Sequence, residues 1–149
     1  MATIQLPIDF KEFLQLLRSE QIEYLLVGGY AVGYYGYPRA TGDLDIWIAV
    51  HARNANGLVR VLKKFGFASA SLSTDLFVKP DQVIRMGVPP LRIELLTGIS
   101  GVHFTDCYAN HTTDFIDGIE VDLISLEDLR KNKAAAGRAK DQDDLEHLP

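Results

Sequence analysis

The spacing of apolar residues changes along the chain and predicts a succession of helices and short strands. Phe10, Phe13, Leu14 and Leu17 recur at helical intervals, which indicates a helix of about three turns. Residues 24–27 then form a short apolar run, which is typical of a buried strand. The chain therefore opens with a helix that leads into a strand of the core.

The strongest strand pattern lies at residues 43–50. Leu44, Ile46 and Ile48 alternate with side chains of different character, so this strand has one apolar face. The same reasoning predicts the other elements, which in chain order are a short helix over 30–35, a helix over 52–65, a short helix near 74–77, strands over 83–86 and 91–96, a short helix over 103–109, a strand over 119–124, a helix that ends near 136 and a last helical piece over 139–148. Together these elements make an α+β chain.

Two of the helix starts carry capping residues. Asp9 and Glu12 have the spacing of a capping box at the start of the first helix. Ser125, with Asp128 three residues later, predicts the N-terminus of the helix that ends near 136. Gly137 then interrupts the helical pattern before the last helical piece.

The composition indicates one ordered domain with a moderate negative charge. Of the 149 residues, 47% are hydrophobic and 23% are charged, so we expect residues 1–149 to form a single domain with a core. The net charge of −5 argues against bulk binding of DNA, which needs a positive field. The one cysteine, Cys107, excludes an internal disulfide framework and favours the cytoplasm. No apolar run approaches the roughly 20 residues of a membrane span, so we expect no membrane segment.

The first candidate for chemistry is a pair of acids on a strand. Asp43 and Asp45 are two residues apart, so their side chains point to the same side of the strand. Two carboxylates at this separation repel each other unless a positive charge compensates them, and oxygen ligands of this kind suit Mg²⁺ or Mn²⁺. The alternative is an edge strand whose polar face is exposed to water.

Two further features lie in the neighbouring predicted elements. Gly28 and Gly29 end the strand at 24–27 and precede a helix, where backbone N–H groups can approach phosphate oxygens. A third acid, Glu94, lies between apolar residues of the strand over 91–96. It is either part of the same site as the two aspartates or the partner of Arg92 or Arg85 in an ion pair.

In this order and spacing the motifs resemble the nucleotidyltransferase superfamily of the DNA polymerase β type. The resemblance is to its small prokaryotic members, the minimal nucleotidyltransferases and the nucleotidyltransferase-like abortive-infection toxins. The similar segments, which together span roughly residues 22–145, are Val27–Tyr30, Asp43–Ile46, Arg92–Leu96 and Asn132–Asp141. The resemblance implies a nucleotidyltransferase fold, with a short mixed β-sheet and flanking helices.

The same resemblance implies an activity, which is the transfer of a nucleoside monophosphate from an NTP with release of pyrophosphate. Asp43, Asp45 and Glu94 would be the catalytic residues and the ligands of Mg²⁺ or Mn²⁺. Gly28 and its neighbours would seat the phosphates, and Lys133 and Arg138 would point into the carboxylate cleft. The full set of expected nucleotide-binding residues is Gly28, Gly29, Tyr30, Arg39, Thr41, Lys133 and Arg138.

The acceptor hydroxyl is left open by the sequence. A protein side chain, a tRNA end and a small molecule are all compatible with these motifs. The alternative function is a catalytically degenerate module that binds a nucleotide or a protein, such as the antitoxin-like partner in a toxin–antitoxin pair. Tyr30, which stands where many members have serine, favours this alternative, whereas the complete set of three acids opposes it.

Overall fold

The sheet at the centre of the fold has six strands in the order β3-β4-β2-β1-β6-β5. The computed structural model describes residues 4–39, 41–67, 72–88 and 90–149. The pairs β1–β6 and β2–β4 are parallel, and the other neighbours are antiparallel, so the sheet is mixed. The strands are β1 (Tyr24–Val27), β2 (Asp43–Ile48), β3 (Val83–Val88), β4 (Leu91–Leu96), β5 (Thr112–Ile116) and β6 (Ile119–Leu123).

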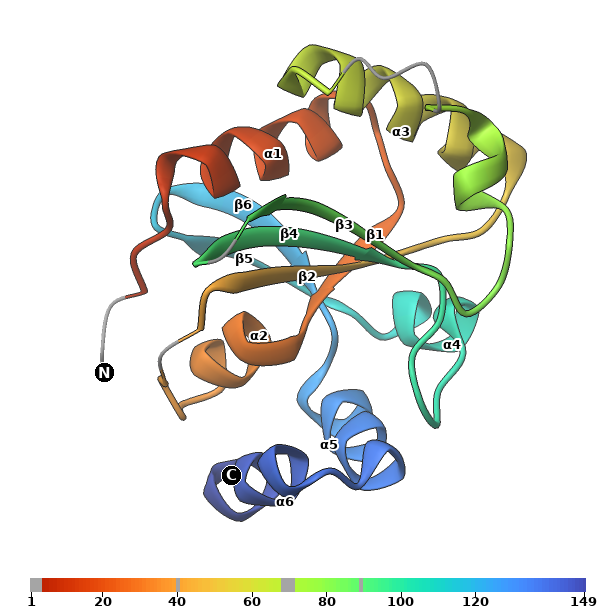
Figure 1. The fold of residues 1–149 in the computed structure, drawn as a ribbon. Coiled ribbons are helices and arrows are strands. Elements are labelled where there is room, and N and C mark those ends of the chain that lie inside the picture. The colour runs from red at the N-terminus through yellow and green to blue at the C-terminus, as the bar shows by residue number, and fades with distance from the viewer. Residues whose placement is uncertain (1–3, 40, 68–71, 89) are drawn as a thin grey trace.

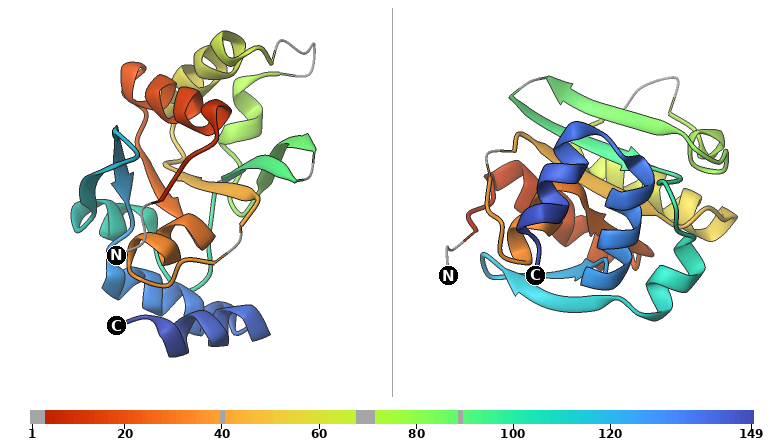
Figure 2. Two further views of the ribbon diagram at one scale, coloured as in Figure 1. Left: turned by 90° about the vertical axis from the view of Figure 1, so that its left-hand side faces the viewer. Right: turned by 90° about the horizontal axis from the view of Figure 1, so that it is seen from below.

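Helices cover both faces of this sheet. Helices α1 (Ile8–Ser19) and α3 (Ala52–Phe65) lie on one face, above the sheet in Figure 1. The opposite face is covered by α2 (Gly28–Tyr34), α4 (Phe104–Ala109), α5 (Leu126–Ala136) and α6 (Ala139–His147). Figure 2, which includes a view from below, shows α5 and α6 side by side in front of the sheet. A short 3₁₀ helix, η1 (Thr74–Phe77), follows α3.

The alternation along β2 separates a core face from a polar face. Leu44, Ile46 and Ile48 are fully buried in the core that α1 and α3 cover. Trp47 belongs to the second core, which includes residues of α2, α4 and α5. Because side chains alternate along a strand, Asp43 and Asp45 share the face of Trp47 and lie on the side of the sheet where α5 and α6 pack.

The predicted α+β fold is confirmed, and one strand was missed. Strand β5 lies at the edge of the sheet, and its side chains are mostly exposed, so its sequence carries little hydrophobic signal. The capping box at the first helix is wrong, since α1 begins at Ile8 after Pro7 and no side chain caps it. None of the helices in the described parts of the chain has both the length and the apolar character needed to cross a bilayer.

The predicted start of α5 is confirmed, and it leads to a stability prediction. The backbone N–H of Asp128 donates a hydrogen bond to Ser125 Oγ over 3.1 Å. We expect Ser125→Ala to lower the free energy of unfolding by about 1 kcal/mol, because a helix N–H loses its partner. Urea unfolding would measure the change, with Ser125→Thr as the control that keeps the acceptor oxygen. Equal losses in both variants would show that the cap does not stabilise α5.

Candidate functional site

The register of β2 and β4 brings the three predicted acids together. The two strands are parallel neighbours, with Asp45 opposite Glu94 and Asp43 opposite Arg92. The three carboxylates line one cleft of about 620 Å³, to which residues of the sheet and of helices α5 and α6 contribute. Gly28 lines the same cleft, together with the cations Arg85, Arg92, Lys133, Arg138 and Lys140. The cleft therefore has an acidic floor with basic residues around it, although the net charge of the chain is −5.

Asp45 and Glu94 form a hydrogen-bonded carboxyl pair. Burial, this hydrogen bond and repulsion from Glu94 and Asp43 raise the pKa of Asp45 to about 7, although Lys140 opposes the shift. A carboxyl group with this pKa holds a proton for much of the time at neutral pH.

The two other contacts of the acids are with arginines. Arg92 donates from Nε and Nη2 to Oδ1 and Oδ2 of Asp43, over 3.2 Å in each case. Arg85 Nε lies 3.0 Å from Glu94 Oε1, and Arg92 Nη2 lies 4.0 Å from the same oxygen. Glu94 therefore lies in the same cleft as the two aspartates and is also paired with an arginine, and its catalytic role stays a prediction.

The donor set suits a divalent metal, but it is not arranged around one. Within the described residues, no group of three or more His, Cys, Asp or Glu side chains is placed to hold a metal ion together. Asp43 explains this, because both of its carboxylate oxygens face Arg92. The chemistry of the set fits Mg²⁺ or Mn²⁺, since all of the donors are carboxylate oxygens.

The side chain of Asp45 lies so close to position 28 that only glycine fits there. The φ of Gly28, +68°, lies in the left-handed region, and a β-carbon at this position would overlap Asp45 Oδ2. The end of β1 thus packs its backbone directly against the carboxyl pair. Gly28 thus contacts an acid of the cleft directly. This contact is compatible with the phosphate binding that the sequence predicts for Gly28.

The other residues of the predicted phosphate seat lie elsewhere. Gly29, Tyr30, Arg39 and Thr41 line a separate hollow of about 230 Å³. Tyr30 is only 8% exposed, and its ring packs edge-on against Phe10. Tyrosine at this position therefore serves the packing of α2 against α1. The assignment of these four residues to nucleotide binding stays a prediction.

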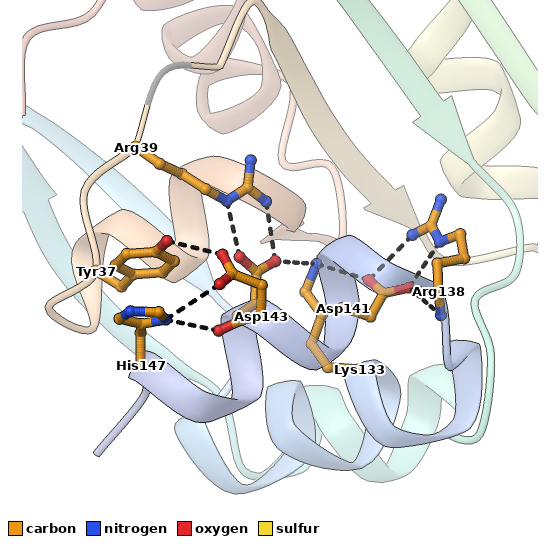
Figure 3. A network of polar contacts seen from close by, with 8 residues as sticks. Tyr37, Arg39, Lys133, Arg138, Asp141, Asp143 and His147 are labelled. Carbon is orange, nitrogen blue, oxygen red and sulfur yellow. Dashed lines mark hydrogen bonds and ion pairs between the residues drawn. The ribbon is translucent and has the colours of Figure 1, made fainter.

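Lys133 also differs from its predicted placement, because its ammonium group does not face the three acids. Its Nζ lies 3.0 Å from Asp144 Oδ2 and 3.2 Å from Asp141 Oδ1, and the lysine is 3% exposed (Figure 3). Gly137 allows this arrangement, since its φ of +65° ends α5 and lets α6 fold back against it. Lys133 is nevertheless one of the residues that line the cleft.

Two arginines complete this buried ionic cluster. Arg39 donates from Nε and Nη2 to the two oxygens of Asp144, over 2.8 and 2.9 Å, and Arg138 Nε donates to Asp141 Oδ2 over 2.6 Å. Burial alone would raise the pKa of Asp141 and of Asp144, but hydrogen bonds from Lys133 and the arginines outweigh it and lower both. Sequence reasoning assigned no role to Asp141 and Asp144. In the sequence they follow the basic residues between 130 and 140 and only balance their charge.

The comparisons with known proteins give the family and the fold of the chain. The family model described as "nucleotidyl transferase of unknown function" (DUF2204) matches residues 8–149. The chain belongs to this family. A crystal structure from Thermotoga maritima, described as a "putative nucleotidyltransferase", is similar to this family member with a TM-score of 0.59. The two share 16% sequence identity over 92% of this chain and 88% of the other, which shows a common fold. None of the curated proteins compared with the chain matches it.

The packing of Gly28 on Asp45 predicts that a β-carbon at position 28 destabilises the protein more than a β-carbon at a glycine with free space around it. We expect Gly28→Ala to lower the free energy of unfolding by about 1–3 kcal/mol more than Gly118→Ala. Gly118 is a matched control, because its φ of +79° is similar and nothing lies within 4 Å of the added carbon. Urea unfolding of the two variants would measure the difference. Equal costs would show that backbone strain alone acts at Gly28.

The buried cluster predicts how stability depends on acidity. The pKa values of Asp141 and Asp144 are lowered from the ordinary 3.8, so their stabilising effect is complete above that pH. It is lost as the pH falls from about 4 through the lowered values. Lys133→Met should cost about 3–5 kcal/mol at pH 7, because it leaves buried carboxylates short of a partner.

In the Lys133→Met variant the loss of stability below pH 4 should be smaller than in the wild type, because the lysine no longer lowers the two pKa values. Urea unfolding between pH 3 and pH 7 would test this. Lys131→Met is the control on the same helix, because Lys131 pairs with the exposed Glu127. An identical acid dependence in the wild type and Lys133→Met would contradict the assignment.

Proposed function

We propose that this nucleotidyl transferase family member moves a nucleoside monophosphate from an NTP to an acceptor hydroxyl and releases pyrophosphate. The observation that carries the proposal is the pairing of β2 with β4, which sets Asp43, Asp45 and Glu94 side by side in a cleft with basic walls. Three carboxylates need positive charge, and a triphosphate needs the same, so the cleft has groups for both.

In this proposal Asp43, Asp45 and Glu94 hold Mg²⁺ or Mn²⁺. A bound divalent ion of this kind stabilises negative charge on the attacking and leaving oxygens of a phosphoryl transfer. The Asp45–Glu94 pair supports the assignment, since two carboxyl groups that share a proton can exchange it for a metal ion.

The chain's own residues have separate tasks around the reacting groups. Arg138 and Lys140, which line the α6 side of the cleft, bind the phosphates and the departing pyrophosphate. Glu94, which lies on β4 across from Asp45, accepts the proton of the acceptor hydroxyl at a carboxylate oxygen. Gly28 keeps Asp45 in place through its backbone contact.

A second candidate is a module that binds a nucleotide or a protein without transfer, such as an antitoxin-like partner. Two contacts favour it. Asp43 is engaged by Arg92, and Lys133 is engaged by Asp141 and Asp144, so these groups have partners already. The completeness of the acidic set favours the enzyme, because a binding module has no need of three adjacent carboxylates.

Label transfer separates the two candidates. The protein is incubated with NTPs labelled at the α-phosphate, Mg²⁺ and a cell lysate, and label is sought in protein, RNA and small molecules. We expect transfer by the wild type and by the control Asp75→Asn, whose side chain is exposed and lies on η1. The double variant Asp43→Asn, Asp45→Asn should lose transfer by at least about 100-fold, since the charge that binds the metal is removed.

Thermal unfolding with NTP and Mg²⁺ gives the complementary measurement. A ligand that binds the folded state raises the melting temperature, and the double variant should lose most of that rise. A rise without any label transfer would favour the binding module. If the melting temperature does not rise and no label is transferred, both the enzyme and the nucleotide-binding module are contradicted.

A further inference from the structure

Arg92 makes more contacts in the carboxylate cleft than the proposed function uses. It lies at the start of β4, where its backbone N–H donates to Gly42 O over 3.0 Å just before β2 begins. Its guanidinium group holds Asp43 through two hydrogen bonds and reaches to within 4.0 Å of Glu94. The negative charges of Asp43, Glu94 and Asp45 raise the pKa of Arg92, so it stays fully cationic.

The position of this guanidinium group competes with a metal ion. Both oxygens of Asp43 accept hydrogen bonds from Arg92, so a metal bound by Asp43 would have to displace these hydrogen bonds. A divalent ion beside Asp43 would also lie next to a like charge. The positively charged guanidinium group of Arg92 therefore lies where a metal ion bound by Asp43 would lie.

The Arg92–Asp43 pair is nevertheless easy to separate. Its side chains are 32% and 34% exposed, and ion pairs with this degree of exposure contribute little to stability. Guanidinium groups also bind phosphate through two parallel hydrogen bonds, in the same way that Arg92 binds the carboxylate. A phosphate that enters the cleft thus offers Arg92 an equivalent partner of higher charge.

From these contacts we infer that Arg92 is a phosphate-binding residue that makes metal binding depend on the nucleotide. Without nucleotide, Arg92 pairs with Asp43 and keeps it from the metal. When a triphosphate enters, Arg92 transfers its two hydrogen bonds to a phosphate, and Asp43 becomes free to bind the metal. This inference rests on the proposed function, because it concerns the same acids and the same triphosphate.

The inference predicts that Arg92→Gln changes the affinities for Mn²⁺ and for inorganic triphosphate in opposite directions. The two affinities are measured separately. In Arg92→Gln, Asp43 has lost its cation, so Mn²⁺ should bind more tightly in the absence of nucleotide, by about tenfold. Inorganic triphosphate, added without metal, should bind more weakly by about tenfold, because one guanidinium group is missing. A residue that only supported the local structure would weaken both ligands together.

The experiment measures Mn²⁺ by electron paramagnetic resonance and inorganic triphosphate by titration calorimetry. Only the Mn²⁺ binding that is lost in the double variant Asp43→Asn, Asp45→Asn is attributed to the cleft, because this variant removes the proposed ligands. Arg92→Lys keeps the charge but not the two-point contact, so its Mn²⁺ affinity should fall between those of wild type and Arg92→Gln. Arg53→Gln is the control, since Arg53 is exposed and lines a different hollow, with Tyr24 and Tyr108. Unfolding midpoints verify that each variant is folded.

The outcomes distinguish this inference from the proposed function. If Arg92→Gln binds Mn²⁺ as wild type does, or more weakly, Arg92 does not hold Asp43 from the metal and the inference is overturned, while the proposed function stands. An unchanged affinity for triphosphate overturns the transfer of Arg92 to phosphate. If neither Mn²⁺ nor triphosphate binds to the wild type or to Arg92→Gln, the proposed function fails and the inference fails with it.

Discussion

The repulsion between three carboxylates on two neighbouring strands is the constraint on which the site depends. Pairing β2 with β4 in parallel sets Asp45 directly opposite Glu94, with Asp43 two residues away on the same face. The structure meets this repulsion by a raised pKa of Asp45, by Arg92 on Asp43 and by Arg85 on Glu94. The acids of the cleft are therefore held by contacts within the protein itself, and in the proposed function a metal ion and a triphosphate take the place of these contacts.

A second ionic centre holds the wall of the cleft in position. Helix α6 joins the rest of the molecule through Asp141 and Asp144, which are fully buried and bind Lys133 on α5 and Arg39 before β2 (Figure 3). Buried charges are costly unless they are well paired, so this contact has one favourable geometry. That geometry places Arg138 and Lys140 along the cleft. The two centres have different uses, because the buried one builds the wall and the more open one is available to ligands.

Much of the fold was predictable because most of its elements carry a local signal. The buried strands β1 and β2, the amphipathic helices α1 and α3, and the Ser125 cap of α5 all follow from spacing within a few residues. Strand β5 did not, because an exposed edge strand needs no apolar pattern to join a sheet. The cap expected at Asp9 failed for a related reason, since the chain before α1 enters through Pro7 and places Asp9 within the first turn.

For the candidate site, the sequence by itself determined that Asp43 and Asp45 share one face of a strand and that a third acid, Glu94, lies on a second strand. Only the tertiary structure decided their partners. The register between β2 and β4 assigned Arg92 to Asp43, and the turn at Gly137 directed Lys133 to Asp141 and Asp144 and away from the cleft acids. The physical reason is that side-chain periodicity is a local property of the backbone. Which charges meet depends on strand register and helix docking, and these are set by contacts between residues far apart in the chain.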